Sequence, residues 1–136
     1  TQKAIMQDAS LSTILDMAGT SDMVLVGIGS TAPDYSSIVR AGYLAREEMQ
    51  ELYNQGIIGD VCAIHFDANG RIADIPINRR VIGIQADDLR KIPLRVAVAG
   101  GSAKSQPIYG ACKIGLVNVL ITDEIAAQGA LSRKGL

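Results

Sequence analysis

Apolar runs alternate with amphipathic segments along this chain of 136 residues. Three apolar runs are typical of strands: 23–26, 94–99 and 117–121. The first run is continuously apolar, which favours a strand buried on both faces of a parallel sheet. Apolar residues at helical spacing predict helices over 10–18, 44–54 and 87–92, a fourth from the glycine turn to about Ile114, and a fifth through Gln128. Because strands alternate with helices, the predicted fold class is α/β, with a mainly parallel sheet and flanking helices.

The middle of the chain predicts a β-hairpin. Its first strand is Val61 to Phe66, its turn is the Asn-Gly type sequence Asp67 to Gly70, and its second strand is Arg71 to Ile75. The segment from Val81 to Ile84 favours a further short strand. By contrast, the segment Thr31 to Tyr43 predicts a loop with one helical turn, and functional residues favour such loops.

Composition narrows the class of protein. The chain is 48% apolar and long enough for one domain or part of one, and its 13 basic and 14 acidic residues form no basic stripe that would grip nucleic acid. Two cysteines, Cys62 and Cys112, and a single histidine indicate neither a disulfide framework nor a zinc site. No apolar run approaches the roughly 20 residues that span a bilayer, so we expect a cytoplasmic protein without a membrane partner.

The glycine turn after the second apolar run is the strongest candidate for chemistry. Gly100 and Gly101 end a strand, and Ser102 and Lys104 lead toward a helix. Glycines let backbone N–H groups approach an anion, while the helix N-terminus and a lysine add positive charge, so this pattern is typical of a phosphate site. Pro107 favours a helix that begins near Ser105, with Lys104 on the loop just before it. The alternative is an ordinary strand-to-helix turn.

Other candidates lie in the first half of the chain. Gly29 and Ser30 follow the first strand, and the carboxyl ends of strands in an open α/β sheet meet at one crevice, so both glycine turns can contribute to one site. Asp60, placed just before a strand, is suited to accept hydrogen bonds from sugar hydroxyls, and Arg40 could clamp an anion. A solvated aspartate and a surface arginine are the alternatives.

Residues for covalent or acid–base catalysis are not evident. The sequence holds no serine–histidine–acid set, no Walker-type phosphate motif and no convincing acid–base pair, and nothing in it indicates a bound cofactor. His65 is interpreted as a hairpin side chain, Asp67 as a turn residue, and Asp87 and Asp88 as caps of a short helix. These absences favour sensing over turnover.

Six stretches resemble the effector domain of SorC/DeoR-type bacterial regulators. They are 24–30 (Val-Leu-Val-Gly-Ile-Gly-Ser), 42–44, 59–70, 80–84 (Arg-Val-Ile-Gly-Ile), 92–104 and 119–124 (Val-Leu-Ile-Thr-Asp-Glu). Their order and spacing follow the family from about Ser10 to Ala130.

The resemblance implies a Rossmann-like fold related to sugar-phosphate isomerases and CoA transferases, in a regulator that binds a phosphorylated sugar and acts as a dimer or tetramer. Lys104 matches the family's phosphate-contacting lysine, and Asp60 matches an acidic residue that faces the sugar. Arg40 and Gly42 lie near another ligand-contacting loop, and Gly29 and Ser30 line the same crevice by position. Gly101 and Ser102 belong to the turn that carries Lys104.

The chain also departs from the family, because it lacks the helix-turn-helix domain that would contact operator DNA and the first part of the effector domain. Residues 1–136 are therefore expected to be the C-terminal part of that domain, and Thr1 is typical of the start of a fragment. The predicted function is sensing of a phosphorylated sugar to control a carbohydrate operon. The alternatives are an isomerase-like or transferase enzyme on the same fold, and a purely structural assembly module.

Overall fold

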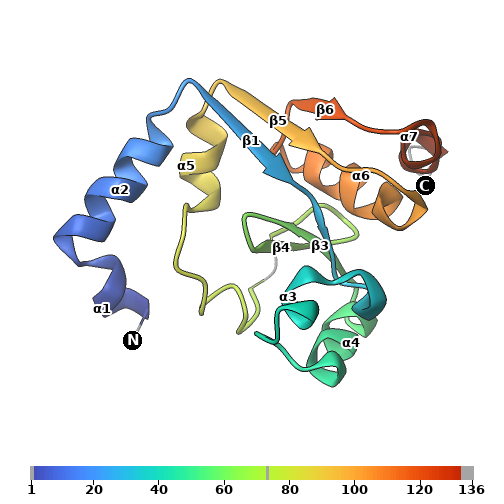
Figure 1. The fold of residues 1–136 in the computed structure, drawn as a ribbon, viewed down its shortest axis with the longest axis horizontal. Coiled ribbons are helices and arrows are strands. Elements are labelled where there is room, and N and C mark those ends of the chain that lie inside the picture. Colours follow the sequence, from blue (N-terminus) through green and yellow to red (C-terminus); the bar gives the residue numbers. More distant parts are fainter. Residues whose placement is uncertain (1, 73, 133–136) are drawn as a thin grey trace.

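A three-stranded parallel sheet organises the upper part of the molecule in Figure 1. The computed structural model describes residues 2–72 and 74–132. The sheet contains β1 (Met23–Gly27), β5 (Leu94–Val98) and β6 (Val119–Ile121) in the order β1-β5-β6, and both pairings are parallel. The α/β class with a mainly parallel sheet is thus confirmed, and each of the three apolar runs predicted as strands agrees with a strand of this sheet to within two residues.

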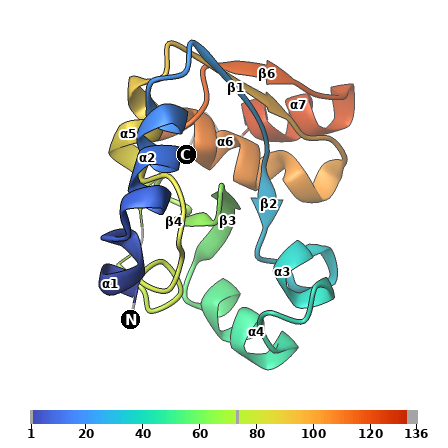
Figure 2. The same cartoon turned by 60° about the vertical axis from the view of Figure 1, so that its left-hand side comes forward.

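A second, antiparallel sheet lies below the first. It contains β2 (Gly29–Ser30), β3 (Ile57–Val61) and β4 (Ile64–Asp67) in that order. Only Ile28 separates β1 from β2, so the chain passes directly from the parallel sheet into the antiparallel one, as Figure 2 shows. This short connection determines the geometry of the candidate site.

The observed helices include all five predicted ones, and a further one at 2–6 that was not predicted. They are α1 (Gln2–Met6), α2 (Ala9–Gly19), α3 (Ser37–Arg40), α4 (Arg46–Asn54), α5 (Ala86–Lys91), α6 (Ser105–Lys113) and α7 (Glu124–Leu131), with 3-10 turns η1 (Pro33–Tyr35) and η2 (Ser102–Lys104). Helix α6 contacts β3, β4 and α7. The side chains of Ile108 in α6 and Phe66 in β4 are both almost fully buried in the core that joins the two sheets. None of the helices in the described ranges is long and apolar enough to cross a membrane.

The predicted hairpin exists but is displaced along the chain. Strands β3 and β4 pair antiparallel, with Val61 opposite Ile64. The turn residues Cys62 and Ala63 have φ values of 51° and 61°, a left-handed conformation that non-glycine residues adopt at a cost. The predicted pairing across the Asn-Gly turn is reduced to one bridge, between Phe66 and Ile72. Ala73, in the predicted second strand, lies outside the described residues.

Two smaller predictions are wrong. Residues 81–84 form no strand. Gln85, not Asp87 or Asp88, occupies the N-cap position of α5. The two aspartates lie in its first turn, where they pair with Arg90 at 3.1 Å and with Lys91 at 2.7 Å. Acidic residues there favour the helix through its dipole without capping it.

One face of the parallel sheet is apolar and exposed. Met23 and Leu25 of β1 are 56% and 66% exposed, and Val98 and Ile121, which share that face through the strand register, are 49% and 56% exposed. The opposite face contains Ala97, which is fully buried. The expectation that β1 is buried on both faces is therefore wrong for this chain, because no described element covers the first face.

Hydrogen bonds of the Asn78 side chain connect the segment before α5 to strand β4 of the hairpin. Its Oδ1 accepts a hydrogen bond from the backbone N–H of His65 at 2.9 Å and lies 3.0 Å from His65 Nδ1, and its Nδ2 donates to the His65 carbonyl at 3.0 Å. The imidazole of His65 is fully buried, in agreement with its interpretation as a hairpin side chain. A single asparagine thus supplies the hydrogen bonds that a neighbouring strand would otherwise provide.

We expect Asn78→Ala to lower the free energy of unfolding by about 1–3 kcal/mol, because it leaves backbone groups of His65 without partners. Urea denaturation followed by circular dichroism measures the change. Asn54→Ala is the matched control, since Asn54 bonds only with Gln50 on an exposed helix face, and its effect should stay within about 0.5 kcal/mol. Equal effects of the two substitutions would show that Asn78 does not anchor the segment.

Candidate functional site

Lys104 lies at the end of η2, immediately before α6, as the sequence predicted. Its half-buried side chain reaches back to the end of β1, where Nζ donates a hydrogen bond to the Ile28 carbonyl at 2.8 Å. Burial lowers the pKa of Lys104 from its ordinary value. The Asp60 carboxylate opposes this shift, whereas the Arg40 guanidinium adds to it. Asp60 and Arg40 therefore both lie within electrostatic range of Lys104.

Asp60 lies inside β3, directly opposite Gly29 of β2, and not before a strand as expected. A Cβ placed on Gly29 would lie only 1.8 Å from Asp60 Oδ1, so the carboxylate occupies the space that a side chain on β2 would fill. Asp60 Oδ2 accepts a hydrogen bond from the backbone N–H of Ala63 at 3.2 Å. The aspartate is thus held over β2 and remains partly accessible.

The glycine turn already has an anion next to it. The backbone N–H of Gly101 donates a hydrogen bond to Asp123 Oδ2, and Gly101 has a φ of 88°, which favours glycine. The Gly101 carbonyl in turn accepts a hydrogen bond from the backbone N–H of Lys104 at 2.9 Å. One N–H group that the sequence suggested for a phosphate is therefore occupied by the protein's own carboxylate.

Ser30 and Ser102 line a pocket of about 250 Å³ beside this cluster. Ser30 is buried, and its Oγ accepts a hydrogen bond from the backbone N–H of Ala32 at 3.2 Å. Tyr35 and Gln106 contribute further polar groups to the pocket wall. The pocket also includes Ala103, the residue before Lys104, and so it lies next to η2.

Gly42 and Arg40 differ in their relation to the cluster. Arg40 is the last residue of α3 and is exposed. Its positive charge contributes to the lowered pKa of Lys104. The Gly42 N–H donates a hydrogen bond to the Val39 carbonyl at 2.9 Å, which closes α3, and no observed contact links Gly42 to Lys104. The structure therefore brings together most, but not all, of the predicted residues.

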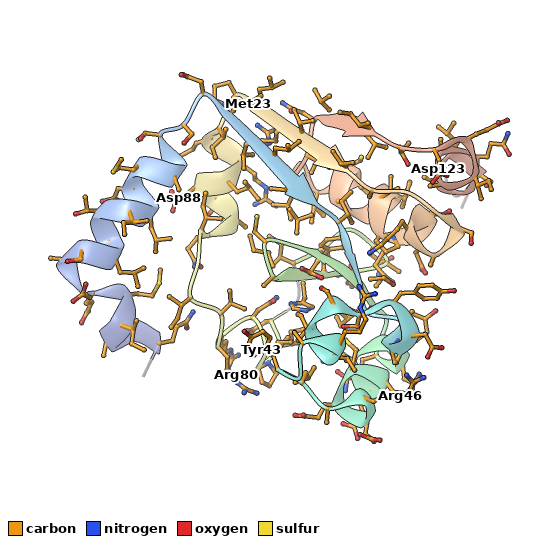
Figure 3. The ribbon with its side chains drawn as sticks, in the orientation of Figure 1. Met23, Tyr43, Arg46, Arg80, Asp88 and Asp123 are labelled. Atoms are coloured by element: carbon orange, nitrogen blue, oxygen red, sulfur yellow. The ribbon has the colours of Figure 1, made fainter. Side chains whose placement is uncertain are left out.

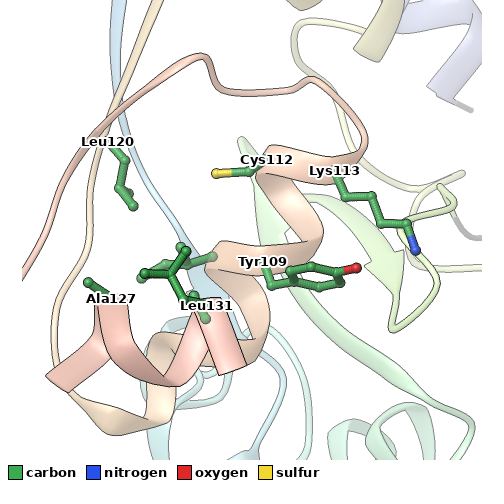
Figure 4. Close-up of a pocket in the computed structure, with 8 residues that line it drawn as sticks. Tyr109, Cys112, Lys113, Leu120, Ala127 and Leu131 are labelled. Carbon is green, nitrogen blue, oxygen red and sulfur yellow. The ribbon is translucent and has the colours of Figure 1, made fainter. Parts of the chain in front are cut away.

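Two larger pockets lie away from Lys104. One, of about 580 Å³, has mainly apolar walls from α6, β6 and α7, including Ile108, Leu120 and Leu131 (Figure 4). The other, of about 440 Å³, is lined by residues that include His65, Tyr43 and Arg80, and Figure 3 shows the last two near each other. Neither pocket contains a residue predicted for the site. The two larger pockets therefore do not coincide with the predicted site, which is marked instead by the charged side chains around Lys104.

The arrangement around Lys104 is suited to a ligand that combines an anion with hydroxyl groups. The two cationic side chains, Lys104 and Arg40, attract negative charge, and the Asp60 carboxylate accepts hydrogen bonds from hydroxyls. Within residues 2–72 and 74–132, no group of three or more His, Cys, Asp or Glu side chains could hold a metal ion.

Comparison with known proteins identifies the family. Residues 1–132 match the family of sugar-binding domains. The chain is 34% identical over 131 residues to the transcriptional regulator LsrR of Enterobacter sp. (strain 638), and 34% identical over 131 residues to the deoxyribonucleoside regulator of Bacillus subtilis (strain 168). These alignments cover 95% and 96% of this chain, and 41% of each relative. The chain spans about two fifths of the length of the curated relatives it matches.

Solved structures agree with this assignment. A sugar-binding domain of a transcriptional repressor from Vibrio fischeri superposes with a TM-score of 0.86 at 35% identity, over 99% of this chain and 54% of that one. The full-length sorbitol operon regulator SorC from Klebsiella pneumoniae gives 0.82 at 29% identity, over 96% and 42%. The chain belongs to the sugar-binding domain family of SorC/DeoR-type transcriptional regulators, which confirms the resemblance.

Sequence reasoning missed the partners of the glycine turn and the hairpin. Asp123 caps the last helix by accepting a hydrogen bond from the Ala126 N–H at 2.8 Å. Its second role at Gly101 joins residues 22 positions apart. The anchoring of His65 by Asn78 is likewise non-local. No short-range pattern in the sequence reports either contact.

The neighbours of Lys104 make its pKa a direct test of the cluster. We expect NMR titration of the lysine side chains to give Lys104 a lower pKa than Lys91, which the Asp88 carboxylate raises. Asp60→Asn should lower the pKa of Lys104 further, because it removes the opposing carboxylate. Arg40→Gln should raise it, because it removes a like charge. If neither substitution moved this pKa, the cluster would not exist in solution.

Proposed function

We propose that this chain is the C-terminal part of the effector domain of a transcriptional regulator and that it binds a phosphorylated sugar. Lys104 and Arg40 would contact the phosphate, and Asp60 the sugar hydroxyls, while Gly29 lets the chain pass close to Asp60. The observation that carries the proposal is the hydrogen bond of Lys104 to Ile28 at the end of β1, with the Asp60 carboxylate and the Arg40 guanidinium both close enough to shift the pKa of Lys104. It joins an anion-binding and a hydroxyl-binding group in one place.

The remaining predicted residues would either contact the ligand or shape the backbone around the site. Ser30 and Ser102 would contact the ligand from the adjoining pocket, and Gly101 would shape the turn before Lys104. Gly42 would act indirectly, because it ends the helix that carries Arg40.

The rest of the effector domain would complete the fold. Parallel sheets are normally covered on both faces, yet Leu25 and its neighbours on the β1-β5-β6 sheet are exposed. The matched part of the Vibrio fischeri domain is 54% of that chain. Both observations support further chain against this face, in a longer regulator whose DNA-binding domain contacts an operator. Assembly into dimers or tetramers in the cytoplasm belongs to the same proposal.

Regulation would follow from coupling between the two functions. A sugar phosphate that binds one arrangement of subunits more tightly than another shifts the population toward it and changes operator affinity. Coupling of this kind typically changes affinity about 5- to 150-fold. No chemical transformation of the sugar is needed for this effect.

One observation supports a second candidate function. An isomerase-like enzyme on this scaffold would need a group of altered pKa near the glycine turn, and the pKa of Lys104 is lowered. Incubation of the full regulator with each candidate sugar phosphate, followed by analysis of products, separates the two functions. Conversion of a sugar phosphate that fails in the Lys104→Gln variant would favour the enzyme.

We expect calorimetric titration of the full regulator with pentose 5-phosphates and hexose 6-phosphates to find a ligand, and Lys104→Gln to weaken its binding about 10- to 150-fold. This is the range for loss of a charge-assisted hydrogen bond of about 1.5–3 kcal/mol. The matched control is Lys113→Gln, because Lys113 lies over the Tyr109 ring at 5.5 Å, outside the cluster. Operator binding, measured in parallel, should change only with the phosphorylated sugar.

Two results would contradict the proposal. The first is operator affinity that no phosphorylated sugar alters. The second is equal affinity of the Lys104→Gln variant and the unsubstituted protein for the best ligand, which would leave Lys104 without a role in binding.

A further inference from the structure

Asp123 joins two elements that are separate in the sequence. It occupies the N-cap position of α7, where Oδ1 accepts a hydrogen bond from the backbone N–H of Ala126 at 2.8 Å. Its other oxygen, Oδ2, accepts a hydrogen bond from the backbone N–H of Gly101. Figure 3 shows Asp123 at the start of α7, beside the turn that follows β5. One carboxylate therefore ties the last helix to the glycine turn.

The glycine turn is shaped around this carboxylate. A Cβ on Gly100 would lie 2.4 Å from Asp123 Oδ2, so any larger residue would displace the oxygen. The hydrogen bonds from Ala126 and Gly101 lower the pKa of Asp123, so its carboxylate stays ionised at lower pH than that of an ordinary aspartate. The two acceptor oxygens share the negative charge of the carboxylate, and charge-assisted hydrogen bonds are about twice as strong as neutral ones.

A short path of hydrogen bonds connects Asp123 to Lys104. The Gly101 N–H binds Asp123, the Gly101 carbonyl accepts the Lys104 N–H at 2.9 Å, and Lys104 Nζ donates to Ile28 at 2.8 Å. The first two bonds hold both sides of the Gly101 peptide backbone. These two hydrogen bonds therefore set the orientation of η2. That orientation in turn sets the direction in which the Lys104 side chain leaves the backbone.

We propose that Asp123 is a positioning residue for Lys104, and that it fixes the turn so that the ammonium group lies beside Asp60 at the end of β1. This inference rests on the proposed function in one respect, namely that Lys104 binds a phosphate. The placement of the side chain itself can be measured without a ligand.

The substitution Asp123→Asn separates the two roles of the side chain. Asparagine has one acceptor oxygen and one NH2 donor, so it can still cap α7 at Ala126 but presents a donor to the Gly101 N–H. The matched control is Asp8→Asn, because Asp8 caps α2 through the N–H groups of Ser10 and Leu11 and is remote from Lys104.

Hydrogen exchange and side-chain NMR give the first readout. In Asp123→Asn, we expect the Gly101 amide to exchange at least about tenfold faster while the Ala126 amide stays protected. The pKa of Lys104 should move up toward its ordinary value, because the side chain leaves its half-buried position. Asp8→Asn should change neither. A Lys104 pKa that stays unchanged after the Gly101 bond is lost would overturn the proposal.

Inorganic phosphate supplies the second readout, in the full regulator. Asp123→Asn should weaken phosphate binding about tenfold, and Asp8→Asn by less than about twofold. Equal weakening by both variants would reduce Asp123 to a general structural role and overturn the inference. If the unsubstituted protein bound no phosphate, the proposed function would fail, whereas the Lys104 pKa would still decide whether Asp123 positions that side chain.

Discussion

The connection between the two sheets, Ile28 to Ser30, is the constraint on which the candidate site depends. Within three residues the chain leaves the parallel sheet, pairs with β3 and enters the loop that carries α3. A Cβ at position 29 would overlap the Asp60 carboxylate, so any larger residue there would force that side chain to move. Since Lys104 also bonds to Ile28, residues from the first, middle and last thirds of the chain meet at this connection.

The exposed face of the parallel sheet and the position of the candidate site both follow from the geometry of an open α/β sheet. The site lies where the carboxyl ends of β1 and β5 open, a position that open α/β sheets use for ligands. Such sheets are stable when both faces are covered, and here Met23 and Leu25 are on an uncovered face. In this chain, hydrophobic packing is concentrated on the other side, where α6 links the parallel sheet to the hairpin.

Local patterns in the sequence predicted those features whose causes are local. The strands and α2 follow from periodicity, and η2 and α6 follow from the order of glycine, lysine and proline around Lys104. The hairpin turn lies at Cys62 and Ala63 instead of at the predicted position. These two residues adopt left-handed φ values, which are unusual for residues other than glycine, so the sequence pattern did not predict a turn there. The contacts of Asp60 with Gly29 and of Asp123 with Gly101 depend on tertiary approach, so the sequence pointed to Asp60 as a candidate ligand residue but not to its position opposite Gly29.

The Lys104–Ile28 hydrogen bond would couple ligand binding at the proposed site to the junction of the two sheets. An anion that attracts the ammonium group competes with a backbone carbonyl at the junction of the sheets, so its net affinity is the difference between the two interactions. If Lys104 kept its bond to Ile28, the anion would bind without disturbing the junction. If Lys104 turned away, the β1–β2 connection would lose a charged donor and could repack. A coupling between effector and subunit arrangement needs only such a difference between two states.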